Sequence, residues 1–146
     1  MFTAQETFRA MLRDGIAPAL RDLGLTGSGQ VYRLPDERHW AQLGFQRSSH
    51  NTSTQVRFTI NLSVMSVEQW ELYRAKWSRP LPDRPSASSY YGSWAWFTRI
   101  GSLMPGRRDL WWEVGTVPDP ALPAEVVRSV RDYALPELRA RLGHDD

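Results

Sequence analysis

The chain has 146 residues, of which 41% are hydrophobic and 23% are charged, and its formal net charge is +2. This length and composition are typical of one domain covering residues 1–146, and no apolar run approaches the roughly 18 residues that a membrane span requires. The absence of cysteine excludes disulfides and thiolate metal ligands, and the interleaving of arginines with acidic residues disfavours a nucleic-acid interface.

A helix is predicted to begin at Thr3, which forms a capping-box pattern with Glu6. The same stretch has no basic segment followed by an apolar block, so we expect a cytoplasmic protein. Pro18 lies inside the helical pattern and lacks a backbone donor, which predicts a kink near Gly15 or two abutting helices. Gly24 is the expected end of this helical region.

Alternation of apolar and polar residues then predicts three successive strands, in residues 30–34, 38–48 and 54–66. A second capping-box pattern at Ser66 predicts a short amphipathic helix. Residues 78–93 contain three prolines and five serines, which indicates a long loop. Loops of this length are either mobile flaps or ordered surface crossovers, and both interpretations are open.

Two further strands are expected in residues 94–103 and 110–115, joined as a hairpin by a type II turn at Pro105-Gly106. Apolar side chains at four-residue spacing predict a C-terminal helix in residues 118–143, kinked at its internal proline. The order of elements indicates an α+β domain. Its expected architecture is a single antiparallel five-stranded sheet packed by the N- and C-terminal helices.

Alternation also assigns each strand residue to one face of the sheet. Phe58, Ile60 and Leu62 belong to the face that packs against the helices. The opposite, outer face collects charged, amide and aromatic side chains from several strands. The candidate binding face consists of Trp40, Arg57, Asn61, Arg99, Trp111 and Glu113, and the candidate flap of Tyr90 and Tyr91.

Large aromatic side chains on an outer sheet face need cover, and three interpretations are open. A ligand or partner binds there, or the face is simply solvated. In the third interpretation the chain buries its own outer face as a second small core, with Arg99 and Glu113 as an internal ion pair. The aromatic residues available for that core are Trp70, Trp77, Tyr90 and Tyr91.

No pattern for catalysis or metal binding is found. The histidines His39, His50 and His144 lack the spacing of zinc ligands, so we expect no metal and no cofactor. The segment from Gly101 to Arg108 lacks the Lys and Ser or Thr of a phosphate loop and joins two strands. No residue is therefore predicted to be catalytic.

The segments RFTINL, TRIGSL and DLWWEV, in that order, resemble a bacterial family known only as a domain of unknown function. The helix ending at Leu23-Gly24 and the segment Ala134-Leu135-Pro136 add to a likeness that covers most of the chain. The resemblance implies a single α+β domain in a bacterial cytoplasm, and it carries no reaction, cofactor or catalytic residue. Some small bacterial domains of this kind are immunity proteins that neutralise a toxin.

Two hypotheses for the function follow. The first is a non-enzymatic binding module, such as an immunity protein for a toxin, which uses the outer sheet face and the loop 78–93. The alternative is a small-molecule or nucleotide-binding domain, or a hydrolytic enzyme, with a groove of Arg, Trp and Glu. In that case Arg57 and Arg99 anchor an anion and Glu113 is the general base. Either function is compatible with a monomer or an oligomer.

Overall fold

The strand with the clearest alternation, β4 (Val56–Ser66), is the centre of a six-stranded antiparallel sheet. The computed structural model describes residues 2–143. Along one edge β4 pairs with β3 (His39–Arg47), followed outward by β2 (Val31–Leu34) and β1 (Thr26–Ser28). The strand β1 is the one that alternation does not predict, because its three residues are all exposed and too few to show a period.

The last two strands, β5 (Trp96–Arg99) and β6 (Trp112–Val114), pair with the other edge of β4 and not with each other. The predicted hairpin is therefore wrong. The predicted turn does form, because Arg107 N donates to Met104 O at 3.0 Å and Gly106 has a φ of 86°. The 11 residues of β4 offer an edge long enough for two short strands in succession.

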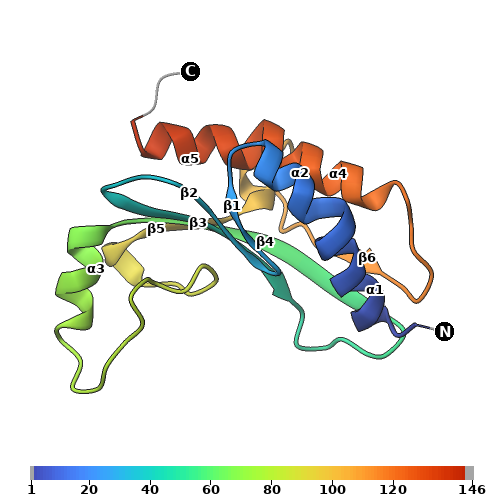
Figure 1. Ribbon diagram of the computed structural model, residues 1–146, viewed down its shortest axis with the longest axis horizontal. Helices are drawn as coiled ribbons and strands as arrows, with labels where there is room; N and C mark the ends of the chain where they lie inside the picture. The colour runs from blue at the N-terminus through green and yellow to red at the C-terminus, as the bar shows by residue number, and fades with distance from the viewer. Residues whose placement is uncertain (1, 144–146) are drawn as a thin grey trace.

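Helices from both ends of the chain form one layer on one face of the sheet, which confirms the α+β architecture (Figure 1). The predicted capping box is present, since Glu6 N donates to Thr3 Oγ1 and Thr3 N donates to Glu6 Oε1, both at 3.1 Å. The helical elements of this layer are α1 (Ala4–Ala10), η1 (Met11–Ile16), α2 (Ala17–Asp22), α4 (Leu122–Ser129), η4 (Val130–Ala134) and α5 (Leu135–Arg141).

Each helical region contains a π-helical turn just before its proline, where the sequence predicts a kink. In the first region Ala17 N donates to Leu12 O, five residues earlier. Pro18 then occupies one of the first two positions of α2, and Pro136 does the same in α5. A missing backbone donor costs little there, because the first N–H groups of a helix have no acceptor within it.

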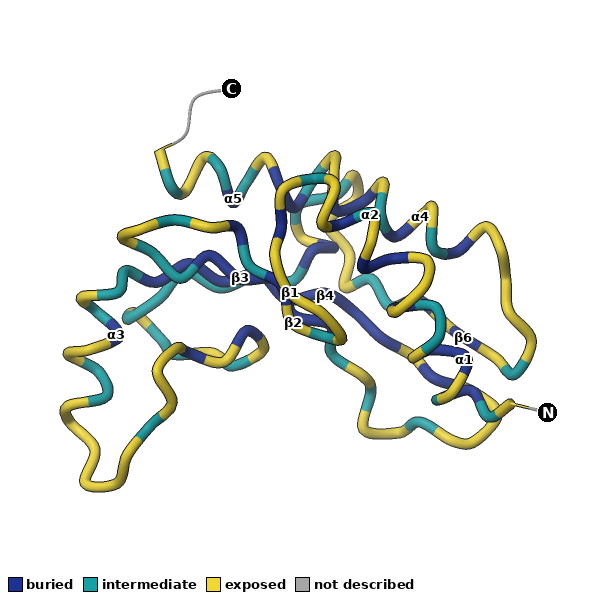
Figure 2. The backbone as a smooth tube through the Cα atoms, in the orientation of Figure 1, coloured by how far each residue is buried: buried dark blue, intermediate teal, exposed yellow. Residues whose placement is uncertain are grey.

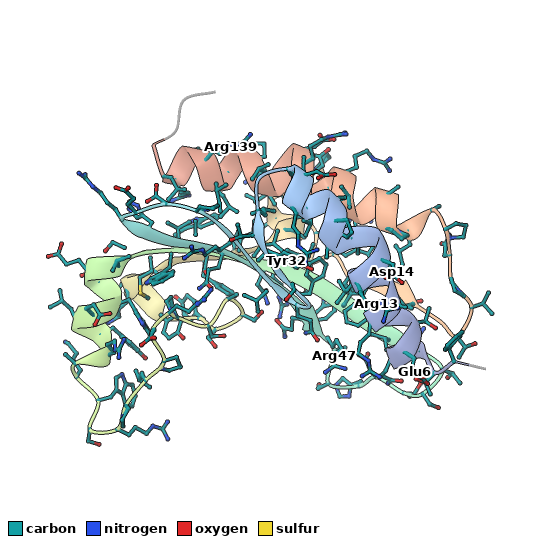
Figure 3. The ribbon with its side chains drawn as sticks, viewed as in Figure 1. Glu6, Arg13, Asp14, Tyr32, Arg47 and Arg139 are labelled. Carbon is teal, nitrogen blue, oxygen red and sulfur yellow. The ribbon has the colours of Figure 1, made fainter. Side chains whose placement is uncertain are left out.

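The hydrophobic core lies between the sheet and this helix layer. Phe58 of β4 is fully buried, and its ring centroid is 5.0 Å from that of Phe8 on α1. Tyr32 on β2 is also fully buried in this core, and Figure 3 marks its place between the sheet and the helices. Figure 2 shows β3 and β4 as long buried stretches, whereas the loops that join the elements are mostly exposed.

The predicted middle helix forms as α3 (Val67–Arg74), with the side chain of Ser66 accepting from Gln69 N at its start. Figure 1 shows α3 and the loop that follows it on the side of the sheet opposite the helix layer. Two short 3-10 turns, η2 (Gly92–Trp94) and η3 (Ile100–Leu103), precede and follow β5. The outer face of the sheet is therefore partly overlaid by residues between β4 and β5.

Candidate functional site

The outer face of the sheet divides into a covered half and an open half. The covered half consists of Gln42, Gly44, Asn61 and Ser63, which are all buried. Gln42 pairs with Ser63 in the register of β3 and β4, and Gly44 pairs with Asn61, so the four residues form one block. This half is polar and yet excluded from solvent, so something in the chain must lie over it.

Residues 78–93 provide that cover as an ordered crossover, one of the two interpretations of this loop. The Gln42 side chain donates from Nε2 to Pro85 O at 2.7 Å, which fixes the loop to β3. At Gly44 the loop comes so close that a Cβ atom would lie 3.0 Å from Ala87 Cβ. A residue without a side chain is what allows this close approach.

Aromatic side chains complete a second small core beside the covered half. Trp70 is only 1% exposed, and its Nε1 donates to Pro82 O at 3.2 Å. The rings of Trp70 and Tyr91 have centroids 5.5 Å apart, and the Tyr91 hydroxyl accepts from Ser86 N at 2.9 Å. Of the two predicted flap residues, Tyr91 belongs to this core, whereas Tyr90 is 73% exposed.

The open half consists of Arg57, Arg99, Asp109, Trp111 and Glu113. Two guanidinium groups lie close to the Trp111 ring, whose centroid is 5.9 Å from Arg57 Cζ and 5.1 Å from Arg99 Cζ. These distances are within the range of cation–π attraction. The Trp111 Nε1 also donates to Asp109 Oδ2 at 3.0 Å, which fixes the orientation of the indole ring.

The ion pairs of the open half differ from the predicted one between Arg99 and Glu113. Arg99 Nη1 lies 3.1 Å from Asp109 Oδ2, and Arg57 Nε lies 3.6 Å from Glu113 Oε1. The register explains the difference, because Glu113 on β6 is directly opposite Arg57, whereas Arg99 on β5 is opposite Asn61. The four charged side chains are 37–58% exposed, so these pairs contribute little to stability.

Two of the six candidate residues lie outside the open half. Asn61 is fully buried, and its Nδ2 donates to Gln46 Oε1 at 2.7 Å. Trp40 lies near the other end of β4 and has the guanidinium carbons of Arg33 and Arg84 each 5.6 Å from its ring centroid. The structure therefore brings together Arg57, Arg99, Trp111 and Glu113 and separates Trp40 and Asn61 from them.

Asp109 is the residue of the open half that the strand pattern did not identify. It lies two residues before Trp111 and four before Glu113, so the same alternation, continued backward, places all three on one face. The predicted strand began at Leu110, which left Asp109 out. In the structure Asp109 contacts both Arg99 and Trp111 and is the carboxylate that orients them.

The charged side chains of the open half lie at the surface. Five cavities along the described residues 2–143 have none of Arg57, Arg99 or Trp111 in their linings. Glu113 borders one of them, an apolar cavity on the side of α1, and its side chain is 58% exposed. Glu113 therefore borders a cavity that the two proposed anion anchors, Arg57 and Arg99, do not line.

Within the described part of the chain, no group of three or more His, Asp or Glu side chains is placed so that it could hold a metal ion. His39 Nδ1 lies 2.9 Å from Asp36 Oδ2, and His50 is exposed. His144, the third histidine, lies outside the described residues. Within residues 2–143 no helix has the length and apolar character to cross a membrane.

A family model described as a domain of unknown function (DUF4304) matches residues 16–140. The chain belongs to this family. The DUF4304 match includes every strand, the middle helix and most of the helix layer, and therefore also the whole outer face. Comparisons with curated proteins and with solved structures gave no match.

Proposed function

We propose that this DUF4304 domain is a non-enzymatic binding module that recognises a protein partner through the open half of its outer sheet face. The observation that carries the proposal is the close contact of the Trp111 indole ring with both Arg57 and Arg99 on the open half. Tryptophan and arginine are the residues most enriched where binding energy concentrates in protein interfaces. The loop 78–93 borders this face and extends the proposed interface.

The side chains of the open half are held in place before any partner arrives. Asp109 accepts from both Trp111 Nε1 and Arg99 Nη1, so the ring and one guanidinium share a single anchor. A side chain that is already ordered loses little conformational entropy on binding. The fixed cluster therefore favours recognition of another protein, although its net energy depends on the groups that the partner presents.

The shape of the open half favours a protein over a small molecule. Small-molecule sites are concave and enclose most of the ligand, whereas protein interfaces are broad and comparatively flat. The alternative of an Arg, Trp and Glu groove for a small molecule has less support, because Glu113 borders one of the cavities described above and Arg57, Arg99 and Trp111 border none of them. A partner such as a toxin, bound by a cytoplasmic immunity protein, fits this chemistry.

The test is to capture partners with the full chain as bait and to measure their affinity by calorimetry. Trp111→Ala is expected to weaken the binding of a true partner by about 30-fold or more, as removal of an interface hot spot does. Arg128→Ala on α4, an exposed arginine of the helix layer, is the control and should bind as the wild type does. Circular dichroism of each variant verifies that the fold is intact.

Two results would refute the proposal. One is a partner whose affinity is unchanged in a folded Trp111→Ala protein and in an Arg57→Ala, Arg99→Ala double variant. The other is the failure of the wild-type chain to capture any protein from the organism that produces it. A clear small-molecule ligand that is lost in Arg99→Ala and Glu113→Ala would support the alternative instead.

A further inference from the structure

A separate cavity lies between α3, the loop 78–93 and the outer face of the sheet. Its volume is about 460 Å³, within the range of small-molecule sites, which is roughly 300–1,000 Å³. None of the open-half residues lines it, so it is independent of the proposed protein interface. The apolar and aromatic part of its lining includes Trp70, Tyr73, Trp77, Leu81, Pro82 and Tyr91.

The aromatic walls of the cavity are fixed by packing against one another. Trp70 and Tyr73 are stacked with centroids 5.5 Å apart and planes 19° apart, and Tyr91 meets Tyr73 edge-on at 5.2 Å. Trp77 is 49% exposed beside them, so one indole ring is available to a molecule that enters. Rigid aromatic surfaces of this kind favour flat ring systems, which stack on them with good contact.

The charged residues of the lining favour a ligand that carries a negative charge. Among the described residues that line the cavity, Arg79 and Arg84 are charged and no acidic side chain is present. Asp83 lies between them in sequence, but its side chain is fully exposed, with Oδ1 3.6 Å from Arg74 Nη1. Aromatic cages that bind ammonium groups would be opposed by two arginines, whereas a phosphate or carboxylate is attracted by them.

The Gln42 side chain connects the sheet to the loop that lines the cavity. Gln42 lines the cavity and is fully buried, with its Nε2 committed to Pro85 O. Its Oε1 is buried and has no hydrogen-bond partner among residues 2–143. A donor in the cavity therefore does not reach it, and the amide acts by holding the loop 78–93 that lines the cavity.

We propose that this cavity binds a planar aromatic ring that carries an anionic group, a ligand with the size of a purine mononucleotide. The ring stacks on Trp77 beside the packed aromatic walls. The anionic group binds Arg79 and Arg84 of the lining. The site adds a small-molecule ligand to a protein whose partner-binding surface lies elsewhere on the same sheet face.

The experiment titrates the full chain with guanosine 5′-monophosphate by calorimetry, with guanosine and ribose 5-phosphate as comparison ligands. We expect saturable binding of the nucleotide, binding of guanosine at least about tenfold weaker, and no measurable binding of ribose 5-phosphate, which lacks the aromatic base. Arg79→Ala should reduce the nucleotide affinity about tenfold and leave the guanosine affinity unchanged. Arg79 suits this test because its side chain makes no hydrogen bond or ion pair within the described chain.

Further variants distinguish binding in this cavity from binding elsewhere on the protein. Trp77→Ala should weaken the nucleotide and the nucleoside alike, while Arg128→Ala and Trp111→Ala should change neither. Failure of both guanosine and adenosine monophosphate to bind saturably at millimolar concentration overturns the proposal. So does nucleotide binding that Arg79→Ala and Arg128→Ala affect equally, because the ligand would then lie outside the cavity. Retention of binding in Trp111→Ala distinguishes this site from the protein interface.

Discussion

The close approach of the loop 78–93 to Gly44 makes Gly44→Ala a sharp test of how the outer face is covered. A methyl group there would lie 2.5 Å from Ser88 Oγ, 3.0 Å from Ala87 Cβ and 3.2 Å from the Ala87 carbonyl carbon. The serine side chain can rotate away, but Ala87 can move only if the backbone of the loop lifts. Overpacking of this kind costs about 1–3 kcal/mol.

Lifting the loop also strains the buried hydrogen bond from Gln42 Nε2 to Pro85 O, which is worth about 1 kcal/mol. Replacing glycine by alanine also reduces the conformational entropy of the unfolded chain. At a backbone conformation that alanine can adopt, this stabilises the folded state by about 0.4–1 kcal/mol. The expected net decrease in the free energy of unfolding is therefore about 1–4 kcal/mol. Chymotrypsin should also cut faster after Tyr90 and Tyr91, because the lifted loop is more accessible.

The matched control is Gly115→Ala, where the nearest atom to a new Cβ is Thr54 O at 3.9 Å. Urea unfolding followed by circular dichroism should show this variant as stable as the wild type or slightly more so. The reasoning fails if Gly44→Ala and Gly115→Ala have the same unfolding free energy within about 0.5 kcal/mol and the same cleavage rate. In that case the loop does not rest on Gly44.

Two further predictions concern buried aromatic residues. Burial raises the pKa of Tyr32 above its ordinary value, so the neutral phenol is favoured in the folded state, and the stability it provides is lost as pH rises from about 10. Tyr32→Phe should remove this loss of stability at alkaline pH. At pH 7 its free energy of unfolding should stay within about 1 kcal/mol of the wild-type value, because the buried hydroxyl has no hydrogen-bond partner in the described chain. A marked destabilisation at pH 7 in urea titrations would contradict this. Trp70→Ala should lower the free energy of unfolding by about 3–5 kcal/mol. Trp77→Ala should lower it much less, because the Trp77 side chain is 49% exposed. Equal losses of stability in thermal unfolding would argue against the second small core.

Most of the local structure was predictable because it depends on neighbouring residues. The capping residues at Thr3 and Ser66 and the turn around Gly106 follow from short-range chemistry, and all three form. The alternation through β4 correctly assigned Phe58 to the core and Arg57 to the outer face. Such assignments need only the two-residue period of a strand.

Strand pairing was harder to predict, because it depends on which edges are free. Residues 96–99 and 112–114 are joined by a turn, as a hairpin would be, yet β4 offers each a longer edge than they offer each other. The same limit explains the ion pairs, since the partner of Arg99 is set by the path of the chain through η3 and the following turn. The path of the chain through these turns cannot be predicted from the local sequence pattern.

The cover over the outer face depends on two small residues that no pattern marks. Gly44 and Ala87 meet across the covered half, and their small size is what allows the loop to lie against the sheet. The aromatic content of α3 indicated that a second core could form, but not which part of the sheet it would protect. The division into a covered and an open half is therefore a result of packing between distant segments.

The lengths of the outermost strands restrict how this protein can meet other chains. One edge of the sheet ends in β1, with three residues, and the other in β5 and β6, with four and three. An incoming extended segment needs a longer row of unpaired N–H and C=O groups to add itself as a further strand. Recognition by β-strand addition is thus disfavoured, as is edge-to-edge aggregation. A partner must therefore bind the side chains on the faces and loops of the protein.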